Sequence, residues 1–145
     1  MSDWYYKNKI FKLTDDKYYG FVYKITCINK LNKYFNFFYI GKKNFFTNRK
    51  QNLSKKELID IKDKRLKKYK IITKESNWLN YNSSNKELIE LIKLNKNDFK
   101  KEILYLCRDK KDLTYLEVKS QFEYKCLESN NCFNSNILGI FFKKN

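Results

Sequence analysis

Two short segments rich in β-branched and aromatic residues constrain the fold of this chain most. Residues 21–27 and 34–40 have the composition of β-strands, and a polar stretch separates them. We expect a β-hairpin that is symmetric about Leu31, so that residues whose numbers add to the same total lie opposite each other. In this register Tyr23 lies directly opposite Tyr39, and both side chains project from one face of the hairpin.

Glycine is scarce, and two of the three glycines, Gly20 and Gly41, bracket this hairpin. Gly41 permits a left-handed backbone or the close approach of a phosphate where the second strand ends, and Lys42 and Lys43 follow it. The alternative is an ordinary glycine at a strand end followed by solvated lysines. Only three of the 32 basic residues are arginines. Arg49 is therefore a candidate for bidentate phosphate binding, against the alternative of a surface cation.

The composition indicates a folded, strongly basic protein. The chain has 145 residues, 32 Lys and Arg against 16 Asp and Glu, and a formal charge of +16. Hydrophobic residues make up 42% and aromatic residues 18%, so a disordered basic arm is excluded as the whole molecule. We expect a polyanionic partner, although lysine bias in the composition accounts for part of the charge. Histidine is absent, which excludes histidine-dependent triads and an imidazole base.

The cysteines and the hydrophobic pattern bear on location. The four cysteines, Cys27, Cys107, Cys126 and Cys132, form no CxxC pair. This spacing favours buried thiols in a reducing compartment over a zinc knuckle. No apolar run approaches the roughly 20 residues that a membrane span requires, and the first residues do not resemble a signal peptide. We therefore predict a cytoplasmic protein with no membrane partner.

The remaining pattern predicts alternating helices and strands. A capping box at residues 54–57 predicts a basic helix that continues to about residue 70. A second helix is predicted from Ser84, a third strand over residues 99–107, and a third helix over residues 112–128. One face of this last helix is predicted from its apolar spacing to contain Tyr115, Val118, Phe122 and Cys126.

The fold prediction is an α/β class. We expect a single compact domain over residues 1–145, with a core at about 18–128. Its sheet is predicted to be small, mainly antiparallel and three-stranded, with helices flanking it. The tail at 133–142 is predicted to add a short strand or to pack irregularly.

The sequence resembles a known family. Residues 21–23 and 39–41 are similar to the paired tripeptides of the GIY-YIG endonucleases; the second matches in full, and the first keeps its tyrosine with the glycine displaced to position 20. The order of the other motifs is similar to that of the small phage-type branch: Trp4-Tyr5-Tyr6, then residues 75–78, 81–84 and 99–104, then Leu116-Glu117. The sequence departs from the pattern in a 15-residue segment between the tripeptides, in Asn82 and in having no histidine.

The resemblance implies a catalytic set. It assigns catalytic roles to Tyr23, Tyr39, Arg49 and Glu117, and it makes Glu117 the ligand of one Mg²⁺ (or Mn²⁺). Tyr23 would activate water, with nearby cations lowering its phenol pKa. Arg49 would hold the scissile phosphate, and Tyr39 would position water or phosphate. Without the resemblance, the residue pattern favours a solvated helix carboxylate at Glu117 over a metal ligand.

The basic run between residues 55 and 74 indicates a surface that follows a nucleic-acid backbone, with aromatic side chains available for packing. Its alternative is a solvated lysine-rich helix. The candidate DNA-binding residues are Lys42, Lys43, Arg65, Lys67, Lys68, Tyr81 and, by a weaker match to a late family asparagine, Asn134.

Two functions from different classes remain open. One is a magnesium-dependent endonuclease that hydrolyses phosphodiester bonds of DNA, most readily double-stranded DNA, without a small-molecule cofactor. The other is a catalytically silent, basic nucleic-acid-binding module on the same scaffold. The sequence predicts neither an oligomeric state nor a target sequence.

Overall fold

A computed structural model describes residues 3–59 and 68–144 of the chain. The chain divides into two compact units, one made of residues 1–45 and 77–145 and the other of residues 46–76. The α/β class is confirmed, whereas a single domain over the whole chain stays a prediction.

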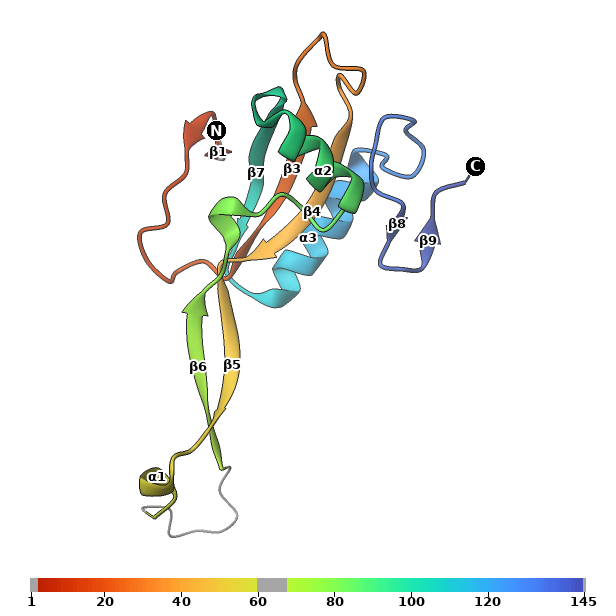
Figure 1. Cartoon of the computed structure of the whole chain (residues 1–145). Coiled ribbons are helices and arrows are strands. Elements are labelled where there is room, and N and C mark those ends of the chain that lie inside the picture. The colour runs from red at the N-terminus through yellow and green to blue at the C-terminus, as the bar shows by residue number, and fades with distance from the viewer. Residues whose placement is uncertain (1–2, 60–67, 145) are drawn as a thin grey trace. The chain divides into compact units, whose positions relative to one another are not determined.

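The first unit contains a five-stranded mixed sheet (Figure 1). Its strands run in the order β2-β1-β7-β3-β4, where β1 is Trp4–Tyr6, β2 Lys9–Ile10, β3 Gly20–Cys27, β4 Phe38–Asn44 and β7 Phe99–Cys107. The pair of β1 and β7 is parallel and the other pairs are antiparallel. The prediction of three strands is therefore wrong. Strands of two and three residues are too short to show alternation, and β1 pairs with a segment far along the chain.

The hairpin of β3 and β4 exists, but its predicted register is wrong. Tyr23 lies opposite Gly41, and Tyr39 lies opposite Ile25. The connecting residues are not symmetric, because the Asn29 side chain accepts a hydrogen bond from the Leu31 backbone amide and itself donates to the Asp98 carboxylate. The displacement is an even number of residues, so both tyrosines stay on the same face of the sheet.

The helices differ from prediction mainly at their ends. Residue Asn85, not Ser84, caps α2 (Lys86–Leu94), and its side chain accepts from the Leu88 amide. The third helix, α3 (Lys110–Glu123), begins at the Asp109 cap and ends before the predicted residue 128. Two short 3₁₀ helices, η1 (Trp78–Asn80) and η2 (Lys96–Asp98), and a small hairpin of β8 (Asn136–Ile137) and β9 (Phe141–Phe142) complete this unit. Of the two alternatives predicted for the tail, the structure shows short strands.

The apolar face predicted for α3 is not the face that packs inward. Tyr115 and Phe122 are 66% and 50% exposed, whereas Leu113, Ser120 and Gln121 are buried. The two polar residues tolerate burial because their side chains are hydrogen-bonded. Ser120 Oγ donates to the Leu116 carbonyl and Gln121 Nε2 to the Ile40 carbonyl. Apolar spacing alone does not detect such satisfied polar positions.

The sheet of the first unit is buried on both faces. Helix α3 packs against β3, β4 and β7, and one core cluster contains Val22, Ile40, Cys107 and Leu113. An aromatic cluster contains Trp4, Phe21, Tyr23, Phe45 and Trp78. All four cysteines are buried and free, as predicted. The central position predicted for the third strand is also confirmed, because β7 lies between β1 and β3.

The second unit is a two-stranded ribbon with one short helix. Strands β5 (Phe46–Asn52) and β6 (Tyr69–Glu75) pair antiparallel over seven residues each. The predicted capping box is confirmed at α1 (Lys55–Ile59), where the Glu57 amide donates to Ser54 Oγ at 3.2 Å. The predicted continuation of this helix lies partly outside the described residues, and its last residues are strand β6 instead. The ribbon itself was not predicted.

Candidate functional site

Three tyrosines meet on one face of the sheet. The ring centroids of Tyr23 and Tyr39 lie 6.1 Å apart, and those of Tyr23 and Tyr81 lie 6.0 Å apart. Tyr23 is 1% exposed, and its hydroxyl is hydrogen-bonded to the Tyr81 side chain. The Tyr39 hydroxyl is hydrogen-bonded to Ser84 Oγ at 3.0 Å. The sheet therefore brings the two hairpin tyrosines together, and Tyr81 joins them from the segment before α2.

Gly41 makes room for these rings. A Cβ atom at Gly41 would lie 2.5 Å from the Tyr23 hydroxyl oxygen and 3.0 Å from Cε1 of Tyr39. The left-handed backbone considered for Gly41 is wrong, because Gly139 is the glycine with a positive φ. The glycine is required because the Tyr23 ring lies directly over the opposite strand, in the space that a side chain would fill.

Burial raises the pKa of both hairpin tyrosines. For Tyr23 the pKa rises well above its ordinary value, first because of burial and then because of the neighbouring Tyr81 and Tyr39. For Tyr39 burial also raises the pKa, and the Ser84 hydrogen bond opposes the rise. The prediction that nearby cations lower the pKa of Tyr23 is wrong for the protein alone. Both phenols are therefore protonated at neutral pH.

A lysine packs on this cluster. The Lys43 ammonium lies 4.2 Å from the centroid of the Tyr81 ring, a cation–π contact. Burial lowers the pKa of Lys43. Lys42 lies on β4 as well, and its ammonium donates to Thr114 Oγ1 on α3 at 3.0 Å. The two lysines predicted to bind DNA thus lie next to the tyrosines and to α3.

A cleft of about 360 Å³ opens beside the tyrosines. Tyr39, Ser84 and Asn85 line one part of it and Glu117, Gln121, Asn134 and residues 135, 136 and 138 the rest. Burial raises the pKa of Glu117, and Lys42 partly offsets this rise. Among the described residues, none forms an ion pair or hydrogen bond with the Glu117 carboxylate. Glu117 is therefore a half-buried carboxylate facing the cleft, and the alternative of a fully solvated helix residue does not describe it.

The chain was compared with models of known protein families. Residues 4–137 match the family described as "Putative endonuclease segE, GIY-YIG domain". The chain belongs to this GIY-YIG family. No curated protein and no solved structure matched it. The match confirms the resemblance seen in the sequence, and membership in an endonuclease family implies DNA as the substrate class.

Divalent metal ions are the usual cofactor of GIY-YIG nucleases. Within residues 3–59 and 68–144, no group of three or more His, Cys, Asp or Glu side chains could hold a metal ion. The cleft offers one carboxylate, Glu117, together with neutral oxygens of serine and asparagine side chains. A hard cation such as Mg²⁺ keeps several water ligands and needs few protein ligands, so this set fits it.

Asn134 of the GIY-YIG domain lines the cleft, but its amide is occupied. The Ile40 amide donates to Asn134 Oδ1 at 2.9 Å, and Asn134 Nδ2 donates to the Ile40 carbonyl at 2.8 Å. Cys132 Sγ also donates to Asn134 Oδ1. The side chain therefore pairs with the outer edge of β4 as a neighbouring strand would.

Sequence reasoning missed Lys101, a buried lysine that supports the tyrosine cluster. Its ammonium donates to the Leu79 carbonyl at 3.3 Å and to Asn82 Oδ1 at 3.2 Å. Lys101 as a whole is only 4% exposed. It lies 4.4 Å from the centroid of the Trp4 ring, and burial lowers its pKa to about 8. The signal in the sequence was the position of this lysine, which falls on the alternating residues of β7 that point into the core.

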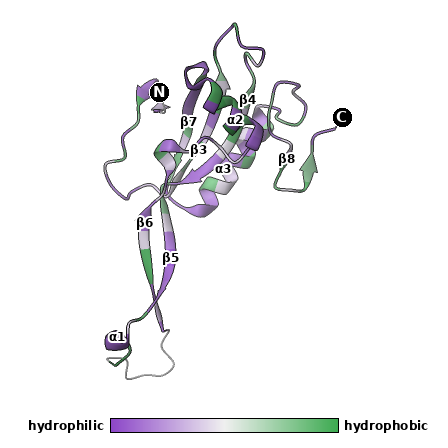
Figure 2. Cartoon of the chain, in the orientation of Figure 1, coloured by the Kyte–Doolittle hydropathy of each residue, from purple (hydrophilic) through white to green (hydrophobic). Residues whose placement is uncertain are grey.

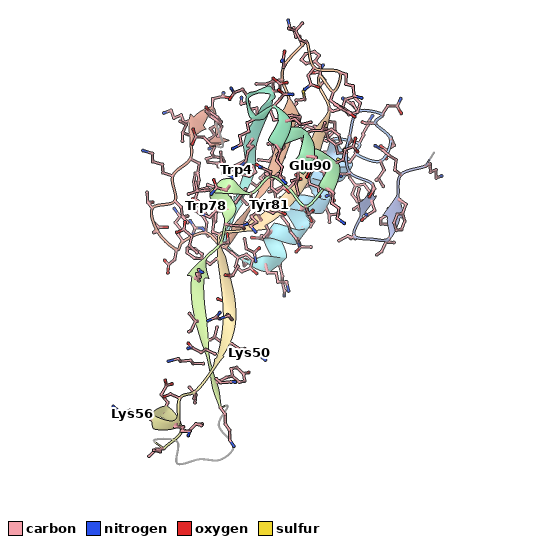
Figure 3. The ribbon with its side chains drawn as sticks, viewed as in Figure 1. Trp4, Lys50, Lys56, Trp78, Tyr81 and Glu90 are labelled. Atoms are coloured by element: carbon pink, nitrogen blue, oxygen red, sulfur yellow. The ribbon has the colours of Figure 1, made fainter. Side chains whose placement is uncertain are left out.

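These contacts fix the segment that carries Tyr81. Trp4 Nε1 donates to the Trp78 carbonyl at 2.7 Å, and the Lys101 ammonium donates to Leu79 and Asn82, which lie on either side of Tyr81. Figure 3 labels Trp4, Trp78 and Tyr81. Tyr81 therefore reaches Tyr23 from a segment that is anchored at both ends.

The other predicted residues lie in the second unit. Arg49 is exposed on β5, opposite Ile72, and Lys68 is exposed just before β6. Arg65 and Lys67 lie outside the described residues. The structure thus brings Tyr23, Tyr39, Tyr81, Lys42, Lys43, Glu117 and Asn134 together in one unit, and it describes Arg49 and Lys68 in the other. No described helix is both long and apolar enough to cross a membrane.

Proposed function

We propose that this protein is an endonuclease that hydrolyses DNA phosphodiester bonds at the cleft between β4 and α3. The observation that carries the proposal is that Glu117 and Tyr39, from distant parts of the chain, line one cleft directly beside Tyr23. The family of endonucleases to which the chain belongs supplies the reaction class.

Each side chain has a proposed role. Tyr23 accepts the proton of the attacking water, and Tyr39, which reaches the cleft, orients that water or the phosphate. Because burial raises the pKa of Tyr23, this role requires cations near the bound DNA to favour the phenolate. Lys43, over the Tyr81 ring, is one such cation. Arg49 is proposed to hold the scissile phosphate through its planar guanidinium.

Glu117 is proposed to hold one divalent cation, Mg²⁺ or Mn²⁺. Its carboxylate lines the cleft and forms no ion pair among the described residues. Burial raises its pKa, and Lys42 only partly offsets this rise. The ion would supply charge stabilisation to the phosphate and the leaving oxygen.

Nicking of a supercoiled plasmid tests the proposal. We expect nicking in Mg²⁺ that EDTA abolishes, and a loss of about 100-fold or more in Glu117→Gln and Tyr39→Phe. The matched control is Glu123→Gln, which removes a carboxylate from the same helix whose partner is the exposed Lys119 at 3.8 Å. This control is expected to cut like the wild type. Cutting that resists EDTA, or full activity in Glu117→Gln, would contradict the proposed site.

One observation favours the second candidate, a silent DNA-binding module. The phenol proposed as the base has a pKa raised well above its ordinary value and is hydrogen-bonded within the protein. Tight binding of duplex DNA with no nicking in Mg²⁺ or Mn²⁺ would establish this candidate in place of the endonuclease.

A further inference from the structure

The ribbon of β5 and β6 has little protein packed against it. Eleven of its fourteen residues are exposed, and the hydrophobic Ile71 is 61% exposed. Figure 2 shows β5 as largely hydrophilic. The described residues of this unit include seven lysines and arginines but only two glutamates, Glu57 and Glu75. A two-stranded ribbon is marginally stable alone, so a partner that binds it would also stabilise it.

The pairing register separates the charges by face. Arg49 lies opposite Ile72, and Lys70 and Lys74 lie two residues to either side of Ile72. Because opposite residues and alternate residues share a face, all three cations project from one face. The remaining residues of that face are the neutral Thr47, Gln51 and Ile72. We call this the Arg49 face, and the strands place three positive charges and no carboxylate on it.

The opposite face of the ribbon is neutral overall. Its two charged residues are Lys50 and Glu75. Asn48 accepts a hydrogen bond from the Thr73 hydroxyl at 2.8 Å across the strands. The Lys50 ammonium lies 4.6 Å from the centroid of the Tyr69 ring, so it is engaged within its own face (Figure 3). The excess charge of the strands therefore belongs to the Arg49 face alone.

The spacing of the three cations suits a phosphate backbone. Lys70 and Lys74 are four residues apart on one strand, which corresponds to about 14 Å at roughly 3.4 Å per residue. Each lies diagonally across from Arg49, at about 7–8 Å. Along the axis of the DNA helix each strand carries one phosphate per about 3.4 Å, so about 14 Å of axis corresponds to about four phosphate steps.

Protein partners compete little for these side chains. Lys70 pairs with Glu57 at 3.2 Å, but both side chains are about half exposed, at 49% and 40%. Such exposed pairs contribute little to stability and are screened by salt. Among the described residues, Arg49 and Lys74 form no ion pair. All three cations are therefore available to an external anion.

We propose that the Arg49 face of the ribbon is a docking surface for the sugar-phosphate backbone of duplex DNA. It binds several adjacent phosphates without reading bases, and it holds the DNA strand on which Arg49 acts. The proposal rests on the proposed function in taking DNA as the substrate and Arg49 as a phosphate-binding residue. Its new content is that Lys70 and Lys74 bind the same strand as Arg49, while Lys50 does not.

The test is the salt dependence of binding, measured by fluorescence anisotropy of a labelled DNA duplex with the full-length protein in EDTA, where we expect no cutting. Lys74→Gln and Lys50→Gln are the matched pair, since each removes one charge from the same ribbon but from opposite faces. The double variant Lys70→Gln/Lys74→Gln gives the size of the effect. Circular dichroism of each variant checks that these exposed substitutions leave the fold intact.

Each lost phosphate contact is expected to reduce the slope of log affinity against log salt by about 0.9, and to weaken binding about 5- to 10-fold near 0.1 M salt. The double variant should therefore lose about 1.8 in slope, and Lys50→Gln should match the wild type. Equal losses in Lys74→Gln and Lys50→Gln would overturn the proposal, since non-specific charge would then explain them. Tighter binding of the single strand than of the duplex would also overturn it.

The two proposals can fail separately. Unchanged binding slopes in a protein that nicks plasmid refute the docking face and leave the endonuclease intact. Reduced slopes in a protein that never nicks support the docking face and refute the endonuclease.

Discussion

Replacement of Lys101 by methionine should change how the stability of the protein depends on pH. The folded pKa of Lys101 is about 8, against about 10.4 for lysine in an unfolded chain. Between these values the unfolded state binds more protons than the folded state, so stability rises with pH. Below about pH 8 the buried charge costs stability, and as the pH rises this cost is progressively removed.

The size of the effect follows from the two pKa values. Between about pH 7 and about pH 9.5, Lys101 should make the free energy of unfolding of the wild type rise by about 2 kcal/mol relative to Lys101→Met. The methionine keeps the apolar stem against Trp4 but leaves the Leu79 carbonyl and the Asn82 amide oxygen without the ammonium. The comparison of two variants at each pH cancels the titration of all other groups.

Urea unfolding at a series of pH values measures this difference. Lys86→Met, which removes an exposed lysine at the start of α2, corrects for the general loss of a positive charge. The compared quantity is the free energy of unfolding of the wild type minus that of Lys101→Met. If this difference stays constant or falls as the pH rises, the reasoning is refuted. Such a result would mean that Lys101 is hydrated or paired in the folded protein.

Three further predictions concern the cleft and the hairpin. Gly41→Ala should destabilise the protein by about 1–3 kcal/mol in urea unfolding, because the new Cβ meets the Tyr23 hydroxyl oxygen at 2.5 Å. Part of this loss should disappear in a Tyr23→Phe background. If the losses of the two substitutions are simply additive in the double variant, the packing argument is contradicted. Asn134→Ala should cost about 1–3 kcal/mol, because it leaves the Ile40 amide without an acceptor, while the Ile40 carbonyl keeps its hydrogen bond from Gln121. A loss below about 0.5 kcal/mol would show that the edge does not depend on Asn134. Because burial raises the pKa of Tyr23 and Tyr39, single-turnover nicking should rise about tenfold per pH unit from neutral into alkaline pH; a flat profile would exclude a phenolate base.

The sequence alone was sufficient to predict the elements whose signal is local. The strand at 99–107, the hairpin and the capping box at Ser54 were predicted because alternation, β-branched residues and cap spacing act over a few residues. Three of the four predicted catalytic residues also meet in one unit, since motif order carries information that periodicity does not.

The parts that were missed depend on distant partners. The hairpin register depends on how Asn29 engages Asp98, and strand β1 exists because it pairs with β7. The inward face of α3 is polar at Ser120 and Gln121, whose partners are backbone carbonyls that no spacing rule reveals. The pKa of Tyr23 was mispredicted for a related reason. Burial by Trp4 and Tyr81 outweighs the nearby positive charge, and burial is a property of the assembled fold.

The outer edge of β4 has a consequence for how copies of this protein meet. Phe38 exchanges backbone hydrogen bonds with residues 131 and 133, and Asn134 occupies both groups of Ile40. An open strand edge is a template on which another chain can add a strand, and this one is closed by residues far along the same chain. The strand that carries Tyr39 therefore cannot pair with a strand of another copy along this edge. In concentrated solution this highly basic protein should resist edge-to-edge aggregation beside its own cleft.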